Sequence, residues 1–307
     1  MEKKVIKEIG FGLDGGKKLD TKLKTRYIMP PFSILRTMDA EWQRRKKEWA
    51  GLGIQSELGR TAECLKTNIG EKYGRKEMTG TSIFDPVLCE LMYKWFCPYI
   101  GASILDPFAG GSVRGIVANF LDYKYTGIDL RKEQVNANKK QGHLIIPSNS
   151  PKWLTGDSLQ VLPTLDEMYD MVFTCPPYGD LEVYSEDKDD ISNMPYSQFM
   201  EIYTAIIAEA VSKLKDNRFA VYVVANYRDK NTGFYYDLVG DTVKAFQAAG
   251  LHFYNEAILQ NSIGTLPVRA ARPFESARKL GKMHQNILVF YKGTDHKDIR
   301  KDFIHEK

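Results

Sequence analysis

Short apolar runs alternate with helical patterns along most of the chain after residue 82. Apolar residues recur at helical spacing from Asp85 to Tyr99, and Gly101 ends that pattern. Beyond it, the sequence predicts seven buried strands, at residues 103–106, 124–129, 152–155, 170–174, 218–225, 252–259 and 286–292. Amphipathic segments between them predict helices at residues 112–121, 131–140, 197–215 and 236–249.

This alternation is typical of an α/β fold with a mostly parallel sheet and helices on both faces. The last strand, 286–292, follows strand 252–259 through a long loop without a clear helical pattern, which permits an antiparallel last strand. We therefore expect one Rossmann-like domain over residues 81–293, followed by a charged tail at 294–307.

Residues 1–80 form a basic extension before this domain. From Trp42 to Leu52 the sequence predicts a helix in which Arg44 and Arg45 lie between two tryptophans. A solvated helical face would explain this pattern, but arginines beside large aromatic side chains also suit contact with phosphates. Arg44 and Arg45 are therefore candidate nucleic-acid contacts.

Composition excludes a few classes of protein but does not identify the function. The 307 residues carry a net charge of +4, which is compatible with a nucleic-acid partner without requiring one. The hydrophobic fraction of 43% is ample for a packed core, and no apolar run approaches the length of a membrane span. The four cysteines form no C-x-x-C pair, so we expect no metal and a reducing, cytoplasmic compartment.

Glycines and polar residues follow each of the first four predicted strands, where a parallel α/β sheet binds its ligands. The first strand runs into Asp106–Ser112, where two adjacent glycines let the backbone approach a ligand closely. Asp129 follows the second strand, at a position where an acidic side chain accepts ribose hydroxyls. Residues 156–158 (Gly-Asp-Ser) follow the third strand, and 175–178 (Cys-Pro-Pro-Tyr) the fourth. Each feature alone is weak, but their ordered occurrence is hard to produce by chance.

This series resembles the motifs of the DNA amino-methyltransferases, which methylate adenine N6 or cytosine N4. More loosely, the N-terminal stretch from Pro30 to Arg60 resembles the leader of methyltransferases often found in bacteriophages and prophages. The resemblance covers about residues 80–293 and is most specific at the D-P-F-x-G-G turn and the P-P-Y turn. It implies a Rossmann-like methyltransferase fold and S-adenosylmethionine as cofactor. It also implies double-stranded DNA as partner, with the target base rotated out of the duplex, in a bacterial or phage-infected cell.

In this family the D-P-F turn binds the methionine part of the cofactor. Acidic residues matching Asp129 and Asp157 bind its ribose and adenine, and a segment matching Phe84–Asp85 folds over the methionine end. The cofactor-binding residues that the resemblance implies are Phe84, Asp85, Asp106, Pro107, Phe108, Ala109, Gly110, Gly111, Asp129, Leu130, Gly156, Asp157 and Ser158.

The resemblance places the reaction at Cys175, Pro176, Pro177 and Tyr178. An exocyclic amine is a poor nucleophile, and two acceptors that hold its hydrogens free its lone pair. The family uses the side chain at the first motif position and the carbonyl of the first proline, whose direction two consecutive prolines fix. Tyr178 would stack on the extruded base.

Cys175 departs from the Asp, Asn or Ser of the family. A thiol is a weak acceptor, and three hypotheses remain: the thiol replaces serine, the Pro176 carbonyl provides most of the catalysis, or the site is inactive. Covalent attack by Cys175 is disfavoured, because cytosine-C5 enzymes lack the P-P-Y turn. Methylation of RNA or of a protein glutamine is an alternative, and so is a non-catalytic DNA- or cofactor-binding protein.

The segment before the last strand concentrates positive charge, which points to contact with phosphates. Its candidate DNA-binding residues are Arg269, Arg272, Arg278, Lys279 and Lys282. Between the P-P-Y turn and the next helix, the acidic run from Glu186 to Asp190 is interpreted as a mobile lid or a solvated loop.

Overall fold

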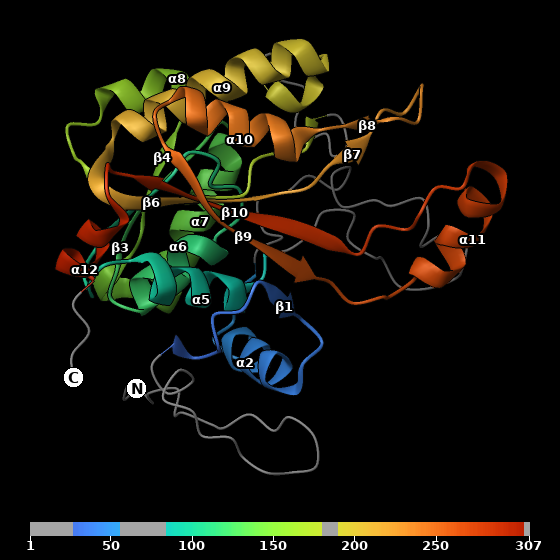
Figure 1. Cartoon of the computed structure of the whole chain (residues 1–307). Coiled ribbons are helices and arrows are strands. Elements are labelled where there is room, and N and C mark those ends of the chain that lie inside the picture. Colours follow the sequence, from blue (N-terminus) through green and yellow to red (C-terminus); the bar gives the residue numbers. More distant parts are fainter. Residues whose placement is uncertain (1–26, 56–83, 180–189, 304–307) are drawn as a thin grey trace.

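The computed structural model describes residues 27–55, 84–179 and 190–303. Its centre is an eight-stranded sheet in the order β1-β9-β10-β6-β5-β2-β3-β4 (Figure 1). Its strands are β1 (Ile34–Arg36), β2 (Ser103–Asp106), β3 (Lys124–Asp129), β4 (Lys152–Thr155), β5 (Tyr169–Thr174), β6 (Leu214–Val224), β9 (His252–Gln260) and β10 (His284–Lys292). Within this sheet, β10 alone runs antiparallel, and it pairs with β6 and β9.

Helices cover both faces of the sheet (Figure 1). One face carries α2 (Ala40–Ala50), α5 (Pro86–Phe96), α6 (Val113–Phe120) and α7 (Lys132–Ile145). The other carries α8 (Ser158–Val161), α9 (Tyr196–Ser212) and α10 (Leu238–Ala248). The remaining described elements are the ribbon of β7 (Tyr227–Arg228) and β8 (Tyr235–Tyr236), α11 (Leu266–Ala277), α12 (Ile299–Asp302), and the short helices η1 (Pro147–Asn149), η2 (Leu162–Thr164), η4 (Ile191–Asn193) and η5 (His296–Asp298).

The two-residue period of the strands divides the core into two clusters. Ile104 and Met171 pack beneath α5 and α6, whereas Leu105 and Val172, their neighbours in sequence, pack beneath α9. All four side chains are fully buried. Strands buried on both faces read as continuous apolar runs, which explains why the sequence pattern located them.

The expected Rossmann-like fold, with a mostly parallel sheet between two layers of helices, is confirmed, including the antiparallel last strand. Two details of the expectation are wrong. The sheet has eight strands rather than seven, because β1 pairs in parallel with β9, with Ile34 opposite Ile258. The segment before β10 also contains a helix, α11, where a loop is expected. None of its residues is buried, so it lacks the buried stripe by which a helix is recognised in sequence.

Helix α2 is part of the packed body, and this changes the meaning of its basic residues. Trp42 and Trp49 are fully buried against α5. Arg45 is only 5% exposed, and its Nε donates to Glu90 Oε2 at 3.0 Å. The prediction that Arg45 contacts nucleic acid is therefore wrong, because its guanidinium is buried and forms an ion pair with Glu90.

Arg44 lies at the edge of the same helix. Its guanidinium pairs with both Glu41 and Glu48, one turn away on either side. Two carboxylates compensate its charge locally, so Arg44 offers little attraction to phosphates. The domain boundary expected at residue 80 falls within residues 56–83, outside the described part of the chain.

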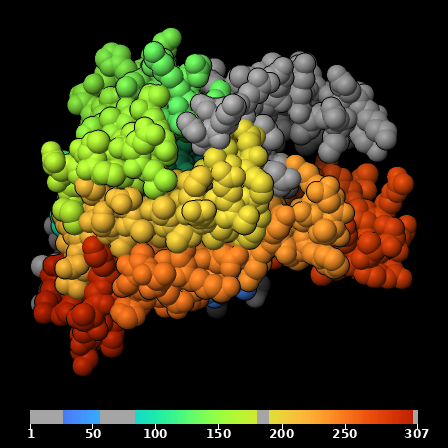
Figure 2. Space-filling view, turned by 90° about the horizontal axis from the view of Figure 1, so that it is seen from above, coloured from blue at the N-terminus to red at the C-terminus, as the bar shows by residue number. Residues whose placement is uncertain are grey.

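The segment around α11 forms one end of the described molecule, and the C-terminal residues around α12 lie toward the other end (Figure 2). Part of the expected charged tail is packed, since Arg218 pairs with Asp302 at 2.6 Å and Phe303 contacts Phe219. No helix in the described ranges is long and apolar enough to cross a membrane.

Candidate active site

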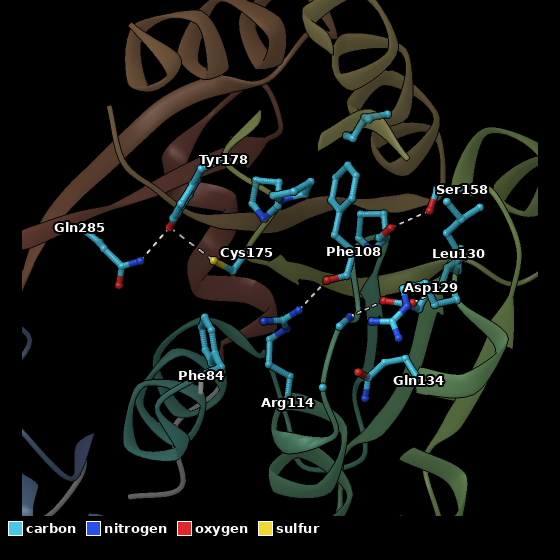
Figure 3. Close-up of a pocket in the computed structure, with 18 of the residues that line it drawn as sticks. Phe84, Phe108, Arg114, Asp129, Leu130, Gln134, Ser158, Cys175, Tyr178 and Gln285 are labelled. Atoms are coloured by element: carbon cyan, nitrogen blue, oxygen red, sulfur yellow. Dashed lines mark hydrogen bonds between the residues drawn. The ribbon is translucent and has the colours of Figure 1, made fainter. Parts of the chain in front are cut away.

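A cavity of about 430 Å³ opens at the carboxyl ends of β2, β3, β4 and β5. This volume lies within the usual range for small-molecule sites. Its wall includes candidate cofactor residues from each of these strand ends and from the segment before α5: Phe84, Asp85, Pro107, Phe108, Gly110, Gly111, Asp129, Leu130, Gly156, Asp157 and Ser158. The four candidate catalytic residues, Cys175, Pro176, Pro177 and Tyr178, line the same cavity (Figure 3).

Asp106 and Ala109 are the two candidate cofactor residues that do not line the cavity. Asp106 is fully buried, and its carboxylate accepts hydrogen bonds from Arg114 Nε at 2.5 Å and from Tyr125 Oη at 2.7 Å. Thr174 Oγ1 also donates to it, at 2.5 Å. Contrary to our expectation of direct contact, the structure makes Asp106 a support beneath the turn, because these donors already occupy its oxygens.

Arg114 lines the cavity, although no sequence pattern singles it out. It is 5% exposed, and its Nη2 donates to the carbonyls of Phe108 at 2.6 Å and Ala109 at 2.9 Å. Its Cζ lies 4.7 Å from the centre of the Phe84 ring. Burial lowers the pKa of this guanidinium, but Asp106 more than offsets that effect, so the net pKa lies above its usual range.

Asp129 ties the glycine turn to the end of β3. Its Oδ2 accepts from Gly110 N and its Oδ1 from Arg131 N, both at 2.9 Å. Gly110 has a φ of +51°, a conformation that glycine adopts at little cost. Burial raises the pKa of Asp129 to about 6. Each oxygen accepts one backbone N–H and keeps capacity for a second donor, such as a hydroxyl, in the cavity.

The turn after β4 is fixed to its neighbours. Gly156 N donates to Asp129 O at 3.0 Å, and Ser158 Oγ donates to Pro107 O at 2.6 Å. Asp157 caps α8 through a 3.0 Å bond from Leu159 N to its Oδ1. Helix capping alone would explain Asp157, but its place in the cavity wall also allows it to meet a ligand.

The Cys-Pro-Pro-Tyr turn follows β5 directly. Cys175 Sγ lies 3.5 Å from Tyr178 Oη. Gln285 of β10 donates from Nε2 to Tyr178 Oη at 2.7 Å (Figure 3). The tyrosine ring is thereby held from a strand 107 positions away in sequence, a contact that no sequence pattern indicates. Gln285 also lines the cavity.

The basic residues near α11 adjoin this site through Asn261 and Ser262, which follow β9 and line the cavity. Arg269 and Arg272 are exposed on α11. Lys282 donates from Nζ to Asn226 O at 2.8 Å, and burial lowers its pKa. The sequence-predicted cations thus lie in the segment that leaves the cavity wall at Ser262 and leads into β10.

The neighbouring β7–β8 ribbon contacts the same segment. Arg228 Cζ lies 3.9 Å from the centre of the Tyr235 ring, and Lys282 Nζ lies 5.9 Å from it. Lys279 Nζ lies against Gly233 at the tip of the ribbon. Arg278 Cζ lies 5.3 Å from the Phe274 ring. Cations and aromatic rings therefore alternate over α11 and the ribbon.

The expected lid falls mostly outside the described residues, which resume at Asp190. Asp190 lines the cavity, and its Oδ1 accepts a 2.9 Å bond from Ser192 N. Across the described ranges, no group of three or more His, Cys, Asp or Glu side chains could hold a metal ion.

No family model matches the sequence, and no curated protein sequence matches it. Similar solved structures include TrmN from Thermus thermophilus, with 14% identity and a TM-score of 0.46 over 68% of this chain and 49% of that chain. Magnesium protoporphyrin IX methyltransferase (ChlM) from Synechocystis PCC 6803 with bound SAM has 14% identity and a TM-score of 0.43, over 67% and 79% of the two chains. A putative RNA methyltransferase, PH1948, from Pyrococcus horikoshii has 14% identity and a TM-score of 0.47, over 82% and 100%. The match to TrmN thus spans about half of that protein.

Proposed function

We propose that this protein transfers a methyl group from S-adenosylmethionine to an exocyclic amino group of a DNA base, adenine N6 or cytosine N4. One observation carries the proposal. The Cys-Pro-Pro-Tyr turn lines the same cavity as the glycine turn, Asp129 and Asp157. A cofactor held by the glycine turn, Asp129 and Asp157 would therefore lie next to an amine held by the Cys-Pro-Pro-Tyr turn.

The residues of the cavity fit the chemistry of the cofactor. Asp129 would accept the ribose hydroxyls, and Asp157 would meet the adenine edge. The backbone of Gly110 and Gly111, together with Phe84, would enclose the methionine part. The cofactor supplies an electrophilic methyl group on its sulfonium, and this protein's residues position the amine in line with it.

The acceptors for the amine come from the turn itself. The Pro176 carbonyl and the Cys175 thiol would hold its two hydrogens, and Tyr178 would stack on the base. Because a thiol is a weak acceptor, we assign the larger contribution to Pro176. The cofactor would supply the methyl group from its S–C bond, Cys175 and Pro176 would hold the amine nitrogen that accepts it, and the methylated amine would lose one proton to water.

The surface of α11 and the β7–β8 ribbon would bind the DNA backbone. Arg269 and Arg272 form no ion pair with the described residues, so their charges remain available to phosphates. On the same surface, Phe274 is 44% exposed and lies under Arg278, and Phe234, which follows Gly233 at the ribbon tip near Lys279, is 77% exposed. Exposed aromatic rings among cations are typical of nucleic-acid surfaces.

Replacing Arg269 and Arg272 together by alanine is expected to weaken DNA binding in low salt and to flatten its salt dependence. Each lost phosphate contact lowers the slope of log K against log salt by about 0.9, so the double variant should lose about two units. Fluorescence anisotropy with a labelled duplex measures this slope. The matched control is the double alanine variant of Arg300 and Lys301 on α12, which removes the same charge at the other end of the molecule (Figure 2). Equal slopes for the two variants would contradict the assignment.

Cofactor binding is expected to weaken as the pH falls through about 6, the pKa to which burial raises Asp129. The ionised carboxylate accepts hydroxyl donors best, so below this pH the apparent Kd should rise by up to about tenfold per pH unit. Calorimetry with S-adenosylhomocysteine between pH 5 and pH 8 measures it. In Asp129→Asn the dependence in this window should vanish; its persistence would show that another group titrates.

The direct test incubates the protein with radiolabelled cofactor and unmethylated duplex DNA, followed by mass analysis of the nucleosides. N6-methyl-2′-deoxyadenosine or N4-methyl-2′-deoxycytidine is the expected product and identifies the base. Label in RNA or in protein instead of DNA would contradict the proposed substrate while leaving the cofactor assignment intact. Binding of the cofactor without any methyl transfer would indicate a non-catalytic protein.

A further inference from the structure

The cavity contains a buried cation whose role the proposed reaction does not explain. Arg114 is 5% exposed and lies in the cavity wall. Its Nε is bound to Asp106, and its Nη2 to the carbonyls of Phe108 and Ala109. Its Nη1 makes no hydrogen bond to any residue that the structure describes.

Removing an arginine from water is costly unless its donors are satisfied. Nε and Nη2 of Arg114 meet this condition, but the two N–H groups of Nη1 do not. Nη1 is not among the solvent-inaccessible polar atoms of the described residues, so a ligand in the cavity can contact it. A rigidly held guanidinium with one amino group turned to a cavity is suited to an anionic ligand group.

Three features locate this ligand group at the inner end of the cofactor site. Cζ of the Arg114 guanidinium lies 4.7 Å from the centre of the Phe84 ring, so the guanidinium faces the segment before α5. It also shares the cavity wall with Cys175 of the Cys-Pro-Pro-Tyr turn. In the close-up view, it lies between Phe84 and Asp129 (Figure 3). Arg114 therefore stands beside the methionine end of a cofactor whose ribose is held by Asp129.

We propose, on the basis of the proposed function, that Arg114 binds the α-carboxylate of the cofactor's methionine part. This carboxylate is the cofactor's only anionic group. It would supply the acceptor that Nη1 lacks, through a charge-assisted hydrogen bond. Asp106 has a distinct part in this arrangement. It holds the guanidinium in position from below and does not touch the ligand.

Two further cations, Lys46 and Arg131, line the cavity. Arg131 lies next to Asp129 at the proposed ribose end, so Lys46 is the alternative partner for the carboxylate. Its side chain is 48% exposed, and its Nζ lies 2.9 Å from Asp85 Oδ2. A half-exposed cation that is already paired contributes less to binding than a buried one. Lys46 is therefore the appropriate control for Arg114.

The test compares S-adenosylmethionine with decarboxylated S-adenosylmethionine, which lacks the carboxylate and keeps the rest of the molecule. Calorimetry on the full chain gives a Kd for each ligand. For the unaltered protein, the decarboxylated ligand should bind at least about tenfold more weakly, as expected for loss of a charge-assisted hydrogen bond. In Arg114→Met this ratio should fall close to one, whereas in Lys46→Met it should stay unchanged.

The ratio is measured on folded protein, so it does not depend on how much of a variant folds. If Arg114→Met does not fold, the double variant with Asp106→Asn removes both buried charges and serves in its place. Equal affinity of the unaltered protein for the two ligands would overturn the role of Arg114 and leave the proposed function standing. The role of Arg114 would also be overturned if the ratio of the two Kd values fell to one in Lys46→Met and stayed unchanged in Arg114→Met. Failure of both ligands to bind would overturn the proposed function as well.

Discussion

Asp106→Ala is expected to lower the free energy of unfolding by about 3–5 kcal/mol, because it leaves the buried guanidinium of Arg114 without its counter-ion. The same substitution removes the acceptor of the hydroxyls of Tyr125 and Thr174. Both are buried, so their donors would be left without partners. Urea unfolding at neutral pH measures the loss.

Asp157→Ala is the matched control for this experiment. Asp157 occupies the equivalent turn after β4, where it caps a short helix, so its loss should cost about 1 kcal/mol. The double variant of Asp106→Ala with Arg114→Met should recover part of the stability, since it removes the unpaired cation. A loss in Asp106→Ala no greater than in the control would show that Asp106 does not support Arg114.

The sequence predicts those site residues whose positions depend only on the order of the strands. Asp129 and Asp157 follow predicted strands, and parallel strands bring their carboxyl ends to one edge of a sheet. Buried strands stand out in the sequence as apolar runs, so the sequence is sufficient to assign both positions. The glycine turn and the Cys-Pro-Pro-Tyr turn meet in one cavity for the same reason.

Long-range pairing of polar groups does not follow from sequence in this way. Arg45 stands in a basic run, yet its partner Glu90 lies 45 positions away and is equally buried. Gln285 holds Tyr178 across 107 positions. Local charge and periodicity show which side chains are polar, but they do not show which polar groups meet when elements pack.

Helix α11 and strand β1 are not predicted from the sequence because they bury few residues, which is a different reason from the long-range pairing of polar groups. Neither contributes a continuous buried stripe: α11 buries no residue, and β1 buries only the central one of its three. Elements at the edge of a fold are held by a few backbone hydrogen bonds and leave a weak periodic signal. At α11, this edge position leaves Arg269 and Arg272 exposed.

Tyr178→Ala is expected to reduce the rate of DNA methylation by about 10- to 100-fold, because base stacking on an aromatic side chain contributes about 1–3 kcal/mol. Affinity for S-adenosylhomocysteine should change little, since Asp129 and Asp157, the residues proposed to bind its ribose and adenine, lie at other strand ends. Single-turnover methylation of a duplex, with the cofactor bound in advance, separates the two effects.

Two variants of the same turn serve as controls for this expectation. Tyr178→Phe keeps the ring and removes the hydroxyl, together with its contacts to Gln285, Cys175 and the Val223 carbonyl, so it should retain most of the rate. Cys175→Ala removes a weak acceptor and should cost less than about tenfold if the Pro176 carbonyl is the main one. If Tyr178→Ala and Tyr178→Phe lost the same activity, the hydroxyl and its tether to β10 would be the essential feature. Stacking on the ring would then have no part in catalysis.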